Sequence, residues 1–302
     1  MTGGETRIRT AAAESGETPL RIGWRRFRKN RLAVLGLAMT ATIVLAALFA
    51  DVAAPYDPAS FLVRTEGMEA KLAAPSTRHI MGTDLYGRDI FSRVLHGARI
   101  SLEIGVFATL VTLLIGVPLG ALAGYKGGFA DDAVSWLMNV VFAFPFLLFV
   151  LAVVSVFRNP SLHLVFVAIG VVNWVSICRV TRSQFLSMRD REFVEAAHAL
   201  GLPARRIVFR HILPNALAPI IVQATMSMGS IITVEAGLAY LGFGAQPPTP
   251  SWGLMISDGQ QYLAQGKWWW SVFPGLAVMY TVLAFNFLGD GLRDAFDVRQ
   301  RL

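Results

Sequence analysis

Charged side chains are scarce in this sequence, where Asp, Glu, Lys and Arg make up only 16% of the 302 residues. Soluble domains typically carry about 25%, so most of the surface must face something other than water. The net charge of +7 could indicate nucleic-acid binding. That class is excluded because the arginines cluster at the ends of apolar runs, where they orient a membrane protein.

Cysteine and catalytic motifs are scarce as well. The single cysteine, Cys178, excludes an internal disulfide, and its apolar surroundings favour a packed side chain over a reactive thiol. The sequence has no phosphate-binding loop, no His-Glu-x-x-His zinc motif and no Gly-x-Ser-x-Gly elbow. Leu288-Gly289-Asp290 faintly resembles an aspartyl membrane protease, but Phe287 stands where that motif has glycine. An intramembrane enzyme is therefore the minor alternative, and the chain cannot hold ATP in the usual phosphate-binding loop.

Long apolar runs are what the sequence does have. Each is close to the roughly 20 residues that cross a bilayer, and they are 32–50, 104–125, 133–157, 162–178, 216–241 and 268–289. The first is longer than the apolar core of about 7–15 residues in a cleavable signal peptide. With both termini inside, most of the 27 Lys and Arg fall on the cytoplasmic side. We predict an all-α integral membrane protein with six transmembrane helices and both termini cytoplasmic.

Composition divides the chain further. The N-terminal stretch is poor in apolar periodicity and is expected to be disordered, whereas the basic run after Trp24 suits a membrane surface. The predicted units are a cytoplasmic tail (1–22), a basic interfacial segment with the first transmembrane helix (23–50), an extracytoplasmic loop (51–100), a five-helix core (101–292) with a cytoplasmic loop at 190–215, and a cytoplasmic tail (293–302).

Within the spans, small and rigid residues predict local geometry. Gly116, Gly120 and Gly124 recur at every fourth position, which places a groove on one helix face for a close neighbour. Pro145 predicts a kink in the third span. The three tryptophans at 268–270 are expected to anchor the last span at the membrane interface.

The loop at 190–215 is a polar interruption that predicts two short helices joined by a bend. Gly201 suits the position just past a helix end, where φ is positive, and Pro203 suits the first turn of the next helix. The spacing places four residues on one face of the first helix: Phe193, Ala196, Ala197 and Leu200. Taken alone, the loop is either an ordinary amphipathic connection or a knob that docks against a partner.

A resemblance favours the second interpretation. Glu195-Ala196-Ala197, then Gly201 and Leu213-Pro214, resemble the EAA signature of binding-protein-dependent ABC import permeases. The signature has Ile where this chain has His211, and the run from Arg210 to Asn215 is similar to the peptide and nickel branch. The segments 82–89, 97–102 and 246–253 resemble the same branch, so that the resemblance extends from 24 to 302. For 82–89, a surface turn followed by an amphipathic helix on the membrane (90–95) remains an alternative.

The resemblance implies the type I transmembrane fold of ABC importers and a C-type subunit in the bacterial inner membrane. Its implied partners are a B-type permease subunit, two ATPase subunits and an extracytoplasmic substrate-binding protein. The chain itself would hold no cofactor, since ATP and Mg bind the ATPases. The implied cargo is a di- or oligopeptide, with glutathione or chelated nickel as alternatives. The residues implied in ATPase coupling are Glu195, Ala196, Ala197, Leu200, Gly201, Arg205, Arg206, Leu213 and Pro214.

Polar side chains inside the spans are candidates for a translocation path, because buried polarity is costly in a membrane. The candidates are Glu235, Asn139, Asn173 and Asn286. For the amides, hydrogen bonding between helices is the favoured explanation, whereas for Glu235 the path and the structural explanation are balanced. A channel subunit that works without ATP is a further alternative.

Overall fold

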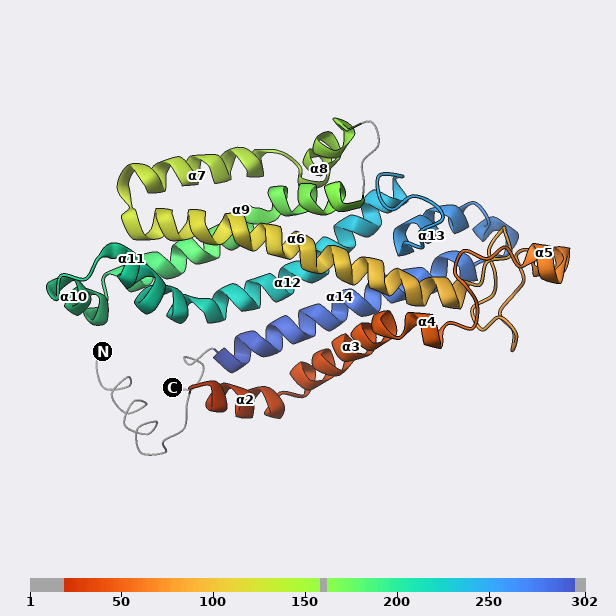
Figure 1. Cartoon of the computed structure of the whole chain (residues 1–302), viewed down its shortest axis with the longest axis horizontal. Coiled ribbons are helices and arrows are strands. Elements are labelled where there is room, and N and C mark those ends of the chain that lie inside the picture. The colour runs from red at the N-terminus through yellow and green to blue at the C-terminus, as the bar shows by residue number, and fades with distance from the viewer. Residues whose placement is uncertain (1–18, 158–161, 297–302) are drawn as a thin grey trace.

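The computed structural model describes residues 19–157 and 162–296, which form a bundle of long helices with shorter helices at its two ends (Figure 1). Most residues of the predicted tails (1–22 and 293–302) lie outside the described residues, as does the turn at Arg158-Asn159-Pro160. Where the tails are described, at 19–22 and 293–296, they are helical and belong to α2 and α14. The helices are α2 (Pro19–Lys29), α3 (Arg31–Leu48), α4 (Ala50–Ala53), α5 (Val63–Glu66), α6 (Ile90–Lys126), α7 (Gly128–Ala143), α8 (Phe146–Ser155), α9 (Leu162–Arg189), α10 (Glu192–Ala199), α11 (Ala204–Ile207), α12 (Leu213–Tyr240), α13 (Trp252–Gln260) and α14 (Trp269–Phe296).

Five helical segments are long and apolar enough to cross a membrane, and the bent pair of α7 and α8 makes a sixth. In Figure 1 the long helices run along the long axis, with α10 and α11 at one end and α5 at the other. The buried centre lies where α6, α9 and α12 meet, around Ile104, Ile169 and Ile231. The predicted all-α membrane fold is confirmed.

The second span is longer than predicted. A separate helix lying on the membrane over Ile90–Leu95 is wrong, because these residues are the first turns of α6. The Asp89 carboxylate caps the helix by accepting the Ser92 N–H at 2.8 Å, which satisfies a donor that helix starts leave free. α6 thus begins inside the segment predicted as a loop.

The glycine stripe on α6 packs as predicted. A Cβ on Gly116, Gly120 or Gly124 would lie 2.5–2.7 Å from a backbone carbonyl oxygen of α9, closer than real Cβ contacts come. Only glycine allows the two backbones to approach this closely. Cys178 is completely buried at this contact.

The third span is broken rather than kinked. α7 and α8 meet at an angle of 87° on either side of Phe144 and Pro145. Pro145 has no N–H to donate and holds Phe144 in an extended conformation with ψ of 136°. The helix therefore ends and restarts instead of bending gently.

The fourth span continues well past its predicted end at Cys178, because α9 runs to Arg189. Arg182 lies inside the helix, where its Nη2 donates to Asp131 Oδ2 of α7 at 2.6 Å. Because Asp131 neutralises its charge, Arg182 can lie within α9 at a point where the sequence predicted the helix to end.

Candidate functional site

The predicted bent loop, residues 190–215, is here called the hinge. Its first helix, α10, ends in a Schellman motif: Gly201 has a φ of +70°, its N–H donates to His198 O, and the Leu202 N–H donates to Ala197 O at 3.2 Å. Pro203 follows at the N-cap of α11, one residue before the predicted first turn. The two short helices and the bend between them are as predicted.

One face of the hinge is fixed to the bundle. Val194, Ala197 and Ile207 are buried and pack against Phe185 of α9, Ile220 of α12 and apolar residues of α6. The prediction that Ala197 shares an outer face with Phe193, Ala196 and Leu200 is therefore wrong. Ala197 faces inward because it stacks one turn from Val194. Leu213 also packs into this cluster.

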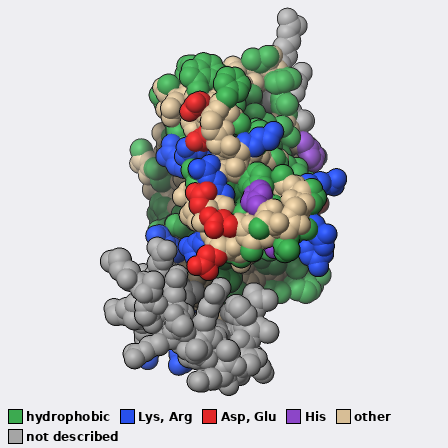
Figure 2. Space-filling view, turned by 90° about the vertical axis from the view of Figure 1, so that its left-hand side faces the viewer, with side chains coloured by type: hydrophobic (Ala, Val, Ile, Leu, Met, Phe, Trp, Pro, Cys, Tyr) green, Lys and Arg blue, Asp and Glu red, His purple; other side chains and the backbone are tan. Residues whose placement is uncertain are grey.

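The other face of the hinge is exposed (Figure 2). Leu200 is 78% and Phe209 62% exposed, and Glu195 and Ala196 are exposed beside Leu200. An open groove of about 410 Å³ is lined by Pro203, Arg205, Arg206, Phe209 and Arg210. Apolar side chains rimmed by charges are typical of a protein–protein contact.

The second half of the hinge is continuous with a membrane span. Ala204–Tyr240 forms one helical segment of 37 residues, in which a π-helical stretch, Val208–Ile212, joins α11 to α12. Pro214 cannot donate a backbone hydrogen bond, and the Asn215 side chain donates to His211 O at 2.6 Å. The sequence analysis missed this continuity, although the polar interruption before Pro214 is where a π-helical turn could be expected.

A cavity of about 280 Å³ lies at the bend between α7 and α8, closed by α9 and α12. Of the predicted path residues, Asn173 alone lines it. The Asn173 Nδ2 is buried and has no hydrogen-bond partner among the described residues. The remaining lining residues are Val141, Phe142, Phe144, Phe146, Val172, Val175, Ser176, Ser230, Ile231 and Val234.

The other predicted path residues lie elsewhere. Glu235 is fully buried, and the Ser251 hydroxyl donates to its Oε1 at 3.1 Å. Asn139 is exposed on α7, and Asn286 on α14 faces Gly229 of α12. The link from Glu235 to Ser251 was not predicted, although Ser251 lies in the proline-rich segment singled out from the sequence.

The opposite end of the bundle carries what we call the end cap, residues 54–89. The predicted surface turn within 82–89 is instead buried: Thr83, Asp84 and Asp89 have no exposed surface. The Asp84 carboxylate accepts from the Arg88 N–H at 2.9 Å and from Arg88 Nε at 2.6 Å. Burial of these polar side chains is possible because the turn supplies their partners.

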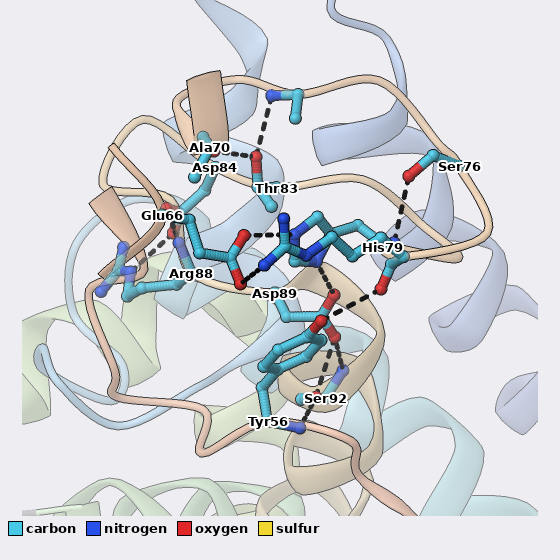
Figure 3. Close-up of polar contacts among 12 residues, drawn as sticks. Tyr56, Glu66, Ala70, Ser76, His79, Thr83, Asp84, Arg88, Asp89 and Ser92 are labelled. Atoms are coloured by element: carbon cyan, nitrogen blue, oxygen red, sulfur yellow. Dashed lines mark hydrogen bonds and ion pairs between the residues drawn. The ribbon is translucent and has the colours of Figure 1, made fainter. Parts of the chain in front are cut away.

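A second set of contacts lies within the end cap and reaches α6 through the Ser92 hydroxyl, which accepts from the Tyr56 N–H at 3.2 Å (Figure 3). His79 lies between two carboxylates, with Nδ1 3.0 Å from Asp89 Oδ1 and Nε2 3.3 Å from Glu66 Oε2.

The three tryptophans at 268–270 lie next to the end cap. Trp268 is exposed, but Trp269 and Trp270 are buried. The interfacial anchor predicted for all three is wrong, because Trp269 Nε1 donates to Thr83 O at 3.2 Å and both rings pack under the cap.

The residues that the structure describes hold no group of three His, Cys, Asp or Glu that could bind a metal ion. In the Leu288-Gly289-Asp290 run, a Cβ on Gly289 would lie 2.6 Å from Met226 Cγ. Close packing of α14 on α12 is therefore sufficient to explain the glycine.

Comparison with known proteins identifies the family to which this chain is similar. Residues 116–302 match the family described as binding-protein-dependent transport system inner membrane component, and residues 18–75 match the N-terminal transmembrane domain of oligopeptide transport permease C. The dipeptide transport system permease protein DppC of Alkalihalophilus pseudofirmus is 43% identical over 94% of this chain and 91% of its own length.

Other relatives are similar over comparable lengths. DppC of Escherichia coli K12 is 42% identical over 93% of both chains, and the glutathione transport system permease protein GsiD of Pectobacterium atrosepticum is 39% identical over 94% of this chain and 92% of its own. An inward-facing structure of the MetNI methionine ABC transporter has the same fold, with a TM-score of 0.56 at 20% identity over 67% of this chain and 96% of that one. The chain therefore belongs to the family of binding-protein-dependent transport system inner membrane components.

Proposed function

We propose that this chain is the C-type transmembrane subunit of an ATP-driven importer that carries di- or oligopeptides across the bacterial inner membrane. Relatives named for dipeptides and oligopeptides support this cargo, and a relative named for glutathione supports the nearest alternative. Chelated nickel stays a further alternative from the sequence. The observation that carries the mechanism is that the second half of the hinge, from Ala204, and α12 form one helical segment.

The proposed partners follow from the family. A B-type permease subunit would pair with this chain in the membrane, two ATPase subunits would bind ATP and Mg, and an extracytoplasmic binding protein would deliver the cargo. The exposed apolar face and the arginine-lined groove of the hinge suit the ATPase contact. The proposed contact residues are Glu195, Ala196, Leu200, Gly201, Arg205, Arg206 and Pro214, with Ala197 and Leu213 anchoring the hinge from inside.

In the proposed mechanism, closure of the ATPase pair moves the hinge. The helical segment from Ala204 to Tyr240 is about 55 Å long, so a displacement at the hinge reaches the far end of the membrane. Ser230, Ile231 and Val234 on this segment line the cavity. Their movement relative to α9 would open and close the cavity, which is the requirement for alternating access.

Cross-linking tests the proposal. Cys178 is buried, so the Leu200→Cys variant offers a single accessible thiol on the hinge, whereas Val52→Cys offers one at the opposite end of the bundle, where the side chain is 85% exposed. In membranes that contain the whole importer, Leu200→Cys should cross-link to an ATPase subunit and Val52→Cys should not. A hinge that cross-links to no ATPase, or ATP-independent uptake of labelled dipeptide, would contradict the proposal.

A further inference from the structure

The chain reverses direction after α12. Gly242 has a φ of +87°, and the Phe243 N–H donates to Leu238 O at 2.8 Å, as is typical of a helix that ends on glycine. Residues 241–251, here called the outer loop, fold back against α12 and lead into α13, at the end of the bundle opposite to the hinge (Figure 1). Phe243 packs against the central cluster of α6, α9 and α12, so the outer loop lies over the outer end of the buried centre.

Three consecutive residues fix the far end of the outer loop. The Ser251 hydroxyl donates to Glu235 Oε1 at 3.1 Å, and Trp252 Nε1 donates to Val94 O of α6 at 2.9 Å. A Cβ on Gly253 would lie 2.2 Å from a backbone carbonyl oxygen of α12, so only glycine lets α13 begin this close to α12. The bond from Ser251 to Glu235 is the only side-chain hydrogen bond that the described residues form between the outer loop and α12.

Glu235 uses only one of its two carboxyl oxygens in this contact. The side chain has no exposed surface, and its Oε2 has no hydrogen-bond partner in the part of the chain that the structure describes. Buried polar atoms are as a rule paired, and a partly paired buried group is held less firmly than a fully paired one. The contact therefore holds the outer loop on α12 with only a small margin against release.

The position of Glu235 links this contact to the cavity. Val234 and Ile231 precede it on α12 and line the cavity, and all three belong to the helical segment that starts in the hinge. A movement of α12 that opens the cavity therefore also displaces the Glu235 carboxyl. The Ser251 hydroxyl does not follow freely, because Trp252, the next residue, is bonded to α6. The hydrogen bond between Ser251 and Glu235 has to break when α12 moves relative to α6.

We infer that Glu235 is a positioning residue of the transport cycle. Through Ser251 it holds the outer loop on α12 in the resting importer, and this hydrogen bond breaks when α12 moves. The contact thereby opposes movement of α12 until the binding protein and its cargo are in place. The inference rests on the proposed transport function and replaces the interpretation of Glu235 as a path residue, because its carboxyl meets Ser251 and not the cavity.

The first test measures ATP hydrolysis and uptake separately. The whole importer in proteoliposomes is given ATP, with and without the binding protein and labelled Ala-Phe. Ser251→Ala and Glu235→Ala should raise hydrolysis in the absence of the binding protein about fivefold to tenfold, the effect of one lost hydrogen bond of about 1–1.4 kcal/mol. Both should also lower the amount of peptide imported per ATP. Glu235→Gln should recover part of the coupling, because its amide oxygen still accepts from Ser251.

Ser271→Ala is the matched control. The Ser271 hydroxyl donates to Ile256 O at 3.2 Å, so this substitution removes a hydrogen bond of the same kind that ties α13 to α14 and not to α12. Its hydrolysis and uptake should stay as in the wild type. A structural defect in the Glu235 and Ser251 variants would lower hydrolysis and uptake together, and that result would overturn the inference.

The second test asks whether the contact opens. With Cys178→Ala as background, Ser251→Cys and Ser271→Cys each place one buried thiol near the outer end of the bundle. A membrane-impermeant maleimide on the side of the binding protein should label position 251 faster during transport of Ala-Phe than at rest, and position 271 should show no such change. Equal labelling of position 251 in both states would overturn the inference and leave the proposed function standing. If the wild type imports no peptide, the proposed function itself falls and the inference with it.

Discussion

The hinge and the end cap both interrupt the long apolar helices, yet they hold their backbones in opposite ways. The end cap buries Asp84 and Asp89 completely and holds both carboxylates with hydrogen bonds, and buried Arg93 of α6 donates to Pro58 O of the cap. The hinge keeps its charges on the outside and is attached mainly through apolar contacts, with the His198 ring stacked on Tyr125 of α6. Buried charge networks fix one geometry, because any shift leaves a charge unpaired. Apolar contacts on the inner face hold the hinge in position and place no constraint on the partner that its outer face binds.

This difference predicts that substitutions in the end cap act on folding, whereas substitutions on the outer face of the hinge act on transport. Four changes would break or sharpen that contrast, and they are ordered here by the size of the expected effect.

Removing the central carboxylate of the end cap should have the largest effect. Asp84→Ala leaves Arg88 and Arg93 buried beside each other without the carboxylate that faces both, which costs about 3–5 kcal/mol. We expect a large loss of folded protein, measured as yield and melting temperature in detergent. Glu69→Ala, at an exposed position in the same segment, is the control and should melt as the wild type does.

The bend of the hinge comes next. Gly201→Val forces a β-branched residue into a φ of +70°, at a cost of about 1–2 kcal/mol, so the bend should shift while the bundle stays folded. Dipeptide uptake should fall more than tenfold with normal membrane insertion. Gly237→Ala, where nothing lies within 4 Å of the added Cβ, should leave uptake intact. Normal uptake by the Gly201→Val variant would show that this bend has no role in coupling.

A pair of substitutions within α10 separates the two faces of the hinge. Leu200→Ser changes a side chain that is 78% exposed and should lower uptake several-fold with a change in unfolding free energy of at most about 0.5 kcal/mol. Val194→Ala removes part of a fully buried side chain and should lower stability by about 1.5–3 kcal/mol. If Leu200→Ser destabilised the protein as much as Val194→Ala, the contrast between outer and inner face would be lost.

The smallest effect is expected at Asp51, next to the end cap. A hydrogen bond from Arg99, and a weaker one from His96, lower the pKa of Asp51 below its usual value. Because the folded pKa lies below the unfolded value of about 3.9, this stabilisation is present above that pH and is lost as the pH falls through the folded pKa. The pair is largely exposed, so solvent and salt screen it.

The melting temperature of Asp51→Asn should therefore lie slightly below that of the wild type at pH 7, and the difference should shrink as the pH falls below about 4 and in 1 M salt. A difference that grew as the pH fell would contradict this assignment.

The long helices and the glycine contact could be predicted because they depend on spacing along one segment. Glycines at every fourth position from Gly116 to Gly124 predict a close contact with another helix, and a glycine after a helix end, such as Gly201, predicts a positive φ. Neither prediction depends on which residues pack against these glycines.

Other features depend on neighbours that the sequence does not name. Local turn residues identified the segment from Gly82 to Asp89, but its burial requires Trp269, which is almost two hundred positions away. Similarly, Ala197 turns inward because Phe185 and Ile220 lie beneath it. After the break of 87° at Pro145, Val150 and Val154 of α8 pack against α9. Periodicity alone cannot supply these partners.

The glycine contact between α6 and α9 has a consequence for movement. Carbonyl groups of one helix are seated against bare backbone of the other at three successive turns, so sliding by a fraction of a turn would drive neighbouring side chains into that backbone. The two helices can then move only as one rigid unit. Any conformational change during transport must therefore occur in the elements around this pair, first of all in the helical segment that starts at Ala204.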